Sequence, residues 1–200
     1  MAGLIIEEYR GVEQLVYAEV TEDSAENYTT GTVKPLAGVA EISRTTESSS
    51  EVHYYDNMPA VTIESTGADE VTCSVSAIAQ DVLAEITGQF YDEATGTLIE
   101  GERQNKYFAL GYIAEKTSGE KVLVWRFKGT FSIPDSTHNT KDDGTDANGQ
   151  EVTYTGISTT HKFTKTGKGA KAINSLESKV DSTTFFTQVT TPDTVKAKTA

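Results

Sequence analysis

Residues 121–133 read KVLVWRFKGTFSI, and this stretch is the strongest indication of the fold class. Its side chains divide between two faces of an extended strand: Leu123, Trp125, Phe127, Phe131 and Ile133 on one, Arg126, Lys128, Thr130 and Ser132 on the other. A period of two residues predicts a β-strand with one buried and one wet face. Residues 108–112 alternate in the same way, and the turn-forming residues 117–120 lie between the two runs. We therefore predict a long β-hairpin over residues 107–133.

Further strands are predicted from shorter apolar alternations. They cover residues 15–18, 39–42, 60–65, 70–77, 152–154 and 185–189. The runs 60–65 and 70–77 are predicted to form a second hairpin, because Thr66, Gly67, Ala68 and Asp69 between them are typical of a turn. Threonine supports a β-rich fold: it accounts for 30 of the 200 residues, and its branched side chain suits a pleated surface.

One helix is predicted at about residues 78–88. Ile78, Val82, Leu83 and Ile86 form a single helical stripe, and Gly88 follows where a left-handed C-cap is favoured. A weaker pattern predicts a second helix at 170–179, and residues 44–57 and 135–149 are expected to be long loops. The fold class is thus mainly β, a β-sandwich or partly closed barrel with one flanking α-helix. We expect a single domain over residues 1–190 and a flexible tail over 191–200.

The formal net charge is −13, from 17 basic and 30 acidic residues. Residues 1–100 hold 3 basic and 19 acidic residues, whereas residues 101–200 hold 14 and 11. A chain this acidic is a poor candidate for binding nucleic acid or an anionic membrane, because both carry negative charge. The uneven distribution fits either a solvated surface or the stacking of copies of the chain on one another.

The start of the chain, MAGLIIEEYRG, lacks a basic segment followed by an apolar run, and no stretch is apolar enough for a membrane helix. We therefore expect synthesis in a cytoplasm and no membrane partner. The single cysteine, Cys73, allows no disulfide within the chain.

No catalytic, cofactor-binding or metal-binding constellation is predicted. Residues Asp142, Asp143, Asp146, Asn148 and Glu151 invite a calcium interpretation, but their spacing does not fit an EF-hand, which favours a flexible acidic loop. His53, His138 and His161 have no partners at metal-ligand spacing. Asp135, Ser136 and His138 are triad residue types, but they are neighbours in one loop rather than convergent from separate elements.

A local run of lysines, Lys162, Lys165, Lys168 and Lys171, has no acidic residue within it. Three interpretations remain open: a nucleic-acid contact, which would need more stacking aromatics than Phe163 alone, an exposed face, or a contact with an acidic neighbouring subunit.

Several strings in this order resemble one protein family. They are YYDN at 54–57, LAEITG at 83–88, ALGY at 109–112, VWRFKGTF at 124–131, DGTD at 143–146, NGQE at 148–151 and YTG at 154–156. Their order and spacing over residues 10–190 resemble the major tail proteins of long-tailed, non-contractile bacteriophages, which form the tail tube. The resemblance implies a β-sandwich subunit that assembles into hexameric rings, and rings that stack into a tube through which genomic DNA passes during ejection.

The resemblance also implies partners and a location. The chain would contact itself and other tail proteins, namely the tape measure, the tail terminator and the distal tail or initiator proteins. It would assemble in the bacterial cytoplasm, reside in the virion tail and let DNA pass without specific binding.

Three groups of residues are candidates for these contacts. The stacking loop between rings is expected at Arg44, Glu47, Glu51, His53, Tyr54, Tyr55, Asp56 and Asn57, with the two tyrosines as anchors. An acidic lumen that repels DNA is expected to use Glu41, Glu64, Asp69 and Glu70. Contacts between subunits are expected at Lys162, Lys165 and Lys168.

Two other classes of function compete with self-assembly. A decoration or adhesin-like β-domain on the virion surface would bind a host ligand and form no rings. An enzyme would need a nucleophile that the sequence does not display.

Overall fold

The computed structural model describes residues 6–140 and 148–199. In these residues the protein is mainly β, with one large antiparallel sheet of ten strands, one small hairpin and two short helices. The large sheet contains β1 (Tyr9–Asp23), β2 (Tyr28–Thr30), β3 (Lys34–Pro35), β4 (Val39–Tyr55), β5 (Met58–Val75), β8 (Phe108–Lys116), β9 (Lys121–Phe131), β10 (Asp135–Ser136), β11 (Gln150–Ile157) and β12 (Ala172–Leu176). The small hairpin pairs β6 (Phe90–Asp92) with β7 (Thr97–Ile99). The helices are α1 (Gln80–Thr87) and α2 (Ser182–Phe185).

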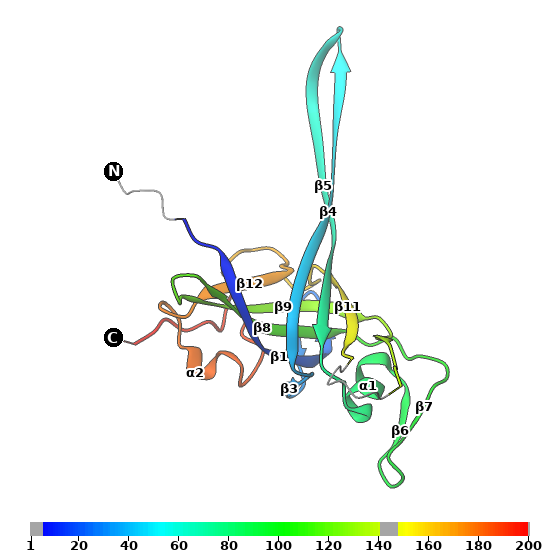
Figure 1. Cartoon of the computed structure of the whole chain (residues 1–200). Helices are drawn as coiled ribbons and strands as arrows, with labels where there is room; N and C mark the ends of the chain where they lie inside the picture. The colour runs from blue at the N-terminus through cyan, green and yellow to red at the C-terminus, as the bar shows by residue number, and fades with distance from the viewer. Residues whose placement is uncertain (1–5, 141–147, 200) are drawn as a thin grey trace.

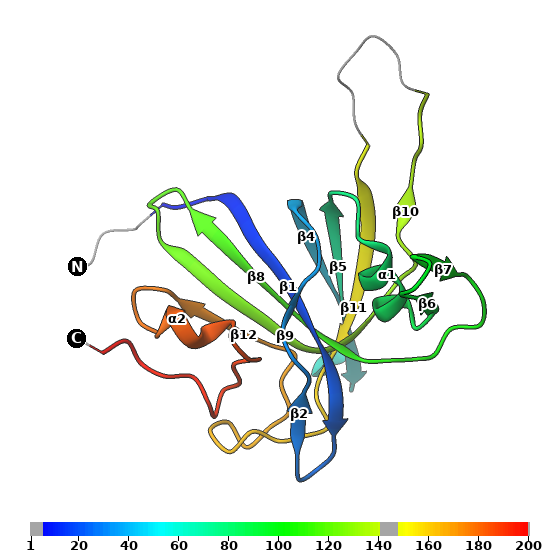
Figure 2. The ribbon, with the colours of Figure 1, turned by 90° about the horizontal axis from the view of Figure 1, so that it is seen from below.

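The main path of the sheet runs β2-β1-β8-β9-β11-β5-β4. No closed barrel forms in the described part of the chain, since β4 ends this path without pairing to β1. The outer halves of β4 and β5 leave the body together as a long projecting ribbon (Figure 1). Seen from below, α2 and the C-terminal segment lie on one side of the molecule, and α1 with β6 and β7 on the other (Figure 2).

The predicted hairpin over 107–133 is confirmed by the pairing of β8 with β9. The prediction that one of its faces is wet was wrong. Val122 and Val124 pack into one hydrophobic cluster, while Leu123, Trp125 and Phe127 pack into a second cluster on the opposite face. Two covered faces make this hairpin the centre of the molecule.

A β-bulge also changes which side chains share a face. Phe108 pairs with Gly129 whereas Leu110 pairs with Arg126, so β9 has one more residue than β8 in this part of the ladder. The bulge reverses the alternation, and Phe131 joins the cluster of Val122 and Val124 instead of that of Trp125. Ile133, predicted on the same buried face, is 56% exposed.

The C-terminal third covers the outer face of β8 and β9. Phe163, Phe185 and Val189 are buried against Trp125 and Phe127, and Trp125 Nε1 donates a 3.0 Å hydrogen bond to the Phe185 carbonyl. Residues 196–198 near the C-terminus then run beside residues 179–181. Asp181 N donates to Lys196 O, and Lys198 N donates to Lys179 O.

The first predicted helix is confirmed. Helix α1 ends at Thr87, and Gly88 adopts the left-handed conformation with φ 68°, as a C-cap glycine does. The weaker helix predicted at 170–179 was wrong: Ala172–Leu176 form strand β12, which supplies hydrogen-bond partners to β9 over Val122–Arg126. The strand predicted at 185–189 was also wrong: helix α2, whose cap Asp181 accepts from Thr183 N, ends at Phe185, and residues 186–189 form a turn.

The second predicted hairpin, 60–65 with 70–77, was wrong as well. Residues 58–75 form one continuous strand, and the chain passes straight through the predicted turn at 66–69. The reversal occurs instead at Asp56 and Asn57, so residues 44–57, predicted to be a loop, belong to strand β4 and its turn. Of the loop predicted at 135–149, Asp135 and Ser136 form β10, paired with Glu151 and Gln150.

Candidate interaction site

The projecting ribbon, residues 46–67, is called the arm below. No residue of the arm is buried, and all but Thr46 and His53 are exposed. Its two strands pair with each other from Ser48 opposite Thr66 out to Tyr55 opposite Met58. An isolated two-stranded hairpin is marginally stable in water at best, because it has no hydrophobic face to bury. The arm therefore exposes both of its faces, and none of the described residues covers it.

The tip of the arm is a tight two-residue turn. Asp56 and Asn57 both have positive φ, 50° and 62°, and join the directly paired Tyr55 and Met58. Two left-handed residues between antiparallel strands form the turn type whose twist matches that of a β-hairpin. Asp and Asn tolerate this conformation better than most side chains.

Large apolar side chains gather at the outer end of the arm. Tyr54, Tyr55 and Met58 are 66%, 63% and 67% exposed, and Val52, Val61 and Ile63 are also exposed. Tyr55 lies opposite Met58, and Val61 lies opposite His53 on the same face of the ribbon. Exposed apolar side chains that gather in one patch often mark a contact surface.

The arm is also acidic. Its charged residues are Glu47, Glu51, Asp56 and Glu64, with no lysine or arginine among residues 45–67. The predicted stacking residues therefore all lie in the arm, apart from Arg44 at its base, whose Nη1 donates to Thr46 Oγ1. The structure brings them together on one ribbon.

Two strand edges lack a partner in the described residues. β4 ends the main path of the sheet, and β1 pairs only with β8 over Tyr9–Glu13, before β3 and β2 join its other edge. Unpaired backbone N–H and C=O groups along a strand edge are ready to pair with another chain.

The four predicted lumen residues fall into two environments. Glu41, Glu64 and Glu70 are exposed, whereas Asp69 is only 5% exposed. The register places Glu41 opposite Ser74 and Glu70 opposite Thr155, so both lie on the outward face of the β4-β5-β11 layer. The other members of this face are hydroxyl residues and one more carboxylate: Ser43, Thr45, Thr72, Ser74, Thr153, Thr155 and Glu151.

Asp69 is held in a buried ion cluster instead. Its carboxylate lies 2.6 Å from Arg126 Nη1 and 3.2 Å from Lys171 Nζ, and accepts a 2.9 Å hydrogen bond from Thr46 Oγ1. Burial acts to raise the pKa of Asp69, but the hydrogen bonds from Thr46, Lys171 and Arg126 outweigh it and lower the pKa. Asp69 is therefore a charged structural residue at the base of the arm.

The lysine run lies in the segment between β11 and β12. Lys162, Lys165 and Lys168 are exposed, whereas Lys171 turns inward to Asp69 and to the Gly67 carbonyl. Buried Phe163 and the Asp193 carboxylate, which accepts from Lys165 N at 2.8 Å, hold this segment against the body. Three lysines are thus presented on a fixed loop, as a contact with an acidic neighbour would need.

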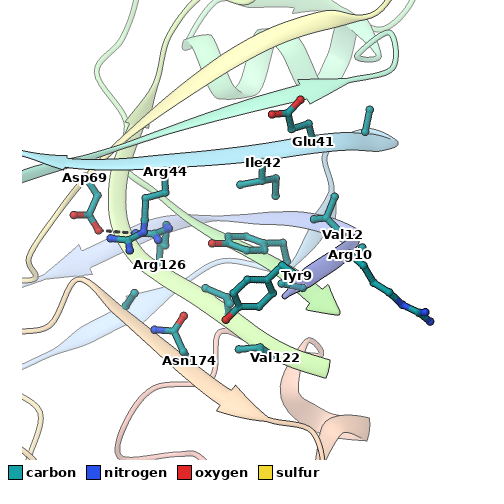
Figure 3. Close-up of a pocket in the computed structure, with 16 residues that line it drawn as sticks. Tyr9, Arg10, Val12, Glu41, Ile42, Arg44, Asp69, Val122, Arg126 and Asn174 are labelled. Atoms are coloured by element: carbon teal, nitrogen blue, oxygen red, sulfur yellow. Dashed lines mark hydrogen bonds and ion pairs between the residues drawn. The ribbon is translucent and has the colours of Figure 1, made fainter. Parts of the chain in front are cut away.

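A cavity of about 680 Å³ lies at the open side of the sheet, where β1 and β4 face each other without pairing (Figure 3). Tyr9–Val12 of β1 and Ala40–Arg44 of β4 form its sides. Its floor comes from β8, β9 and β12 and contains Tyr112, Ala114, Val122, Val124, Arg126, Ala172 and Asn174.

Within 6–140 and 148–199, no three His, Cys, Asp or Glu side chains are grouped to hold a metal ion. Asp142, Asp143 and Asp146 of the calcium interpretation lie outside the described residues. Cys73 is buried, which raises the pKa of its thiol to about 12. No helix in the described parts of the chain has the length and apolar character needed to cross a membrane.

Comparison of the sequence with known family models and with curated proteins finds no match.

Proposed function

We propose that this chain is a tail-tube subunit of a long-tailed, non-contractile bacteriophage and works by binding copies of itself. The observation that carries the proposal is the arm, a long ribbon with no core of its own and an apolar tip. The curled ten-stranded sheet, flanked by α1, supports the finer assignment to a sandwich or partly closed barrel of tail-tube type. The order of the sequence strings described above adds the family resemblance.

Contacts between rings would use the arm. Burying a large apolar side chain contributes about 1.5–3 kcal/mol, so burial of Tyr54, Tyr55 and Met58 against a neighbour favours the contact. Because the hairpin is already formed in the structure, the contact does not have to order the whole ribbon. Stacking would then remove the apolar tip from water.

Contacts within a ring would use the free edges of β1 and β4, whereas the exposed lysines on the 158–171 segment would join the arm in contacts between rings. A closed ring satisfies every lateral edge, whereas stacked rings repeat along an axis. The acidic arm of one subunit and Lys162, Lys165 and Lys168 of another have complementary charges, which favours correct orientation more than affinity.

The DNA channel would be lined by the hydroxyl- and carboxylate-bearing face of β4, β5 and β11. Glu41, Glu70 and Glu151 there repel phosphates over the 8–10 Å range of screened charges at physiological salt. Asp69 is excluded from this lining because Arg126 and Lys171 already neutralise it. Through the same assembly the chain would meet the tape measure, tail terminator and distal tail proteins in the virion.

The exposed aromatic tip also supports a second candidate, a decoration or adhesin-like domain of the virion surface. In that case Tyr54 and Tyr55 would contact a host ligand, and the chain would not form rings. The two candidates differ in the state of the pure protein at high concentration.

Negative-stain electron microscopy of the concentrated protein tests the proposal. We expect rings or tubes from the wild type, and short or no tubes from the double variant Tyr54→Ser, Tyr55→Ser. The matched control is Phe90→Ser, Tyr91→Ser in the β6–β7 hairpin, where Phe90 is 64% exposed. Tubes that survive loss of both arm tyrosines would remove the arm from the interface, and a wild type that never assembles would favour the surface-domain candidate.

A further inference from the structure

The cavity between β1 and β4 has an excess of positive charge, unlike the rest of this acidic chain. Arg44 and Arg126 line the cavity together with the carboxylate of Asp69, and Lys171, outside the lining, lies 3.2 Å from that carboxylate. Glu41 lies on the rim, but Figure 3 shows its side chain on the opposite side of β4 from Ile42, which points into the cavity. Arg10 on the other rim points outward and pairs with Glu115 at 2.9 Å.

Arg126 is the centre of this charge and is incompletely bonded. It is 4% exposed and donates to Asp69 Oδ2 through Nη1 at 2.6 Å. Its Nε is buried, and the described residues offer it no acceptor. Buried donors are almost always paired, and a guanidinium can bind a second planar oxyanion through the edge that contains Nε.

The remaining walls of the cavity are apolar. Val122 and Val124 of β9 and Ala114 of β8 form the floor, and Val12 and Ile42 face each other across the gap. The ring of Tyr9, which is 66% exposed, lies beside the mouth. The volume is within the range that holds a small organic molecule, about 300–1,000 Å³.

We propose that this cavity binds a small organic carboxylate with an apolar body. The carboxylate lies against Arg126 and Arg44, and the body lies on Val122 and Val124. Arg44 swings from Thr46 to the ligand, which its exposed position at the base of the arm allows. This site is separate from the arm and does not depend on assembly.

Calorimetric titration of the full chain with 4-phenylbutyrate tests the site, at a protein concentration where sedimentation shows a single species. We expect a dissociation constant near or below about 1 mM, and at least about tenfold weaker binding of the uncharged 4-phenylbutanamide. Equal binding of the acid and the amide, or no binding of either, would overturn the proposal.

Three variants locate the carboxylate. Arg126→Lys keeps a cation beside Asp69 but lacks the guanidinium edge, and Arg44→Gln removes an exposed cation. Each is expected to weaken 4-phenylbutyrate about tenfold, with folding checked by near-ultraviolet circular dichroism. Arg10→Gln is the matched control, and it should leave binding unchanged because Arg10 points away from the cavity. A loss as large for Arg10→Gln as for Arg44→Gln would contradict a specific site.

An acidic side chain of a second copy is the other source of a carboxylate. In that case Arg126→Lys and Arg44→Gln would weaken self-association while 4-phenylbutyrate failed to bind the single species, and the small-molecule site would be overturned.

Discussion

Two hairpins of this protein form by the same antiparallel strand pairing, but one is buried and the other is exposed to solvent. The β8–β9 hairpin is covered on both faces, with Phe108, Leu110 and Trp125 all 0% exposed. The arm formed by β4 and β5 is covered on neither face. Backbone pairing alone is therefore enough to form a two-stranded ribbon. Its apolar side chains determine whether the rest of the chain packs over it.

The contrast also separates stability from assembly. The β8–β9 hairpin carries two hydrophobic clusters and so determines whether one chain folds. The arm adds little buried area to one chain but holds the exposed tyrosines. Substitutions in the two hairpins should therefore change different measured quantities.

The largest expected effect is in the covered hairpin. Trp125→Ala removes a fully buried ring and its hydrogen bond to Phe185, and should lower the free energy of unfolding by about 3–5 kcal/mol. Tyr54→Ala in the arm should change it by no more than about 0.5 kcal/mol. Urea denaturation of the dilute protein measures both, and equal losses would erase the distinction between the two hairpins.

An intermediate effect is expected where the arm joins the body. The pKa of Asp69 is lowered in the folded protein, and so is that of Asp23, where burial is outweighed by bonds from Lys128 and the backbone of Thr160 and His161. A lowered pKa stabilises the fold above the ordinary aspartate pKa of about 4, and this contribution is lost as pH falls below that value.

This contribution is expected to disappear progressively as each carboxylate becomes protonated. Urea midpoints between pH 7 and pH 2 measure it. Asp69→Asn should lower stability at pH 7 and flatten the acid limb of the curve; an unchanged acid limb would show that the cluster at the base of the arm is not charged.

The smallest effect is expected at the tip. Asn57 has φ 62°, a left-handed conformation that glycine adopts without steric cost. Asn57→Gly should therefore change the free energy of unfolding by less than about 0.5 kcal/mol. The same variant should leave tube formation intact, because the tyrosines stay in place. A large loss of stability would mean that the tip carries contacts within the chain.

The sequence predicted the covered hairpin because its alternation and its turn are both local. It did not predict that Arg126 is buried, because the partner that stabilises it, Asp69, lies 57 residues upstream. It also did not predict the bulge that moves Phe131 to the other face, because one extra residue in a strand does not change the type of residues that the sequence shows there.

The arm was harder to predict from the sequence. Residues 44–51 are hydroxyl-rich and charged, with no apolar alternation, so they favoured a loop. The glycine at position 67 favoured a turn, but it lies in a strand, where a Cβ added to it would be 2.8 Å from Glu47 Oε2 and 3.0 Å from Glu47 Cβ. The true turn, Asp56–Asn57, contains no glycine. The candidate contact residues were nevertheless predicted to lie together in one segment, because the tyrosines and carboxylates are close in the sequence.

Hydrogen exchange of the backbone amides of residues 46–67, compared between dilute and concentrated protein, tests the central claim most directly. Self-association through the arm predicts fast exchange in the dilute chain and strong protection once rings or tubes have formed. Exchange of the arm that stays fast in the assembled protein, or a chain that remains single at every concentration, would contradict it.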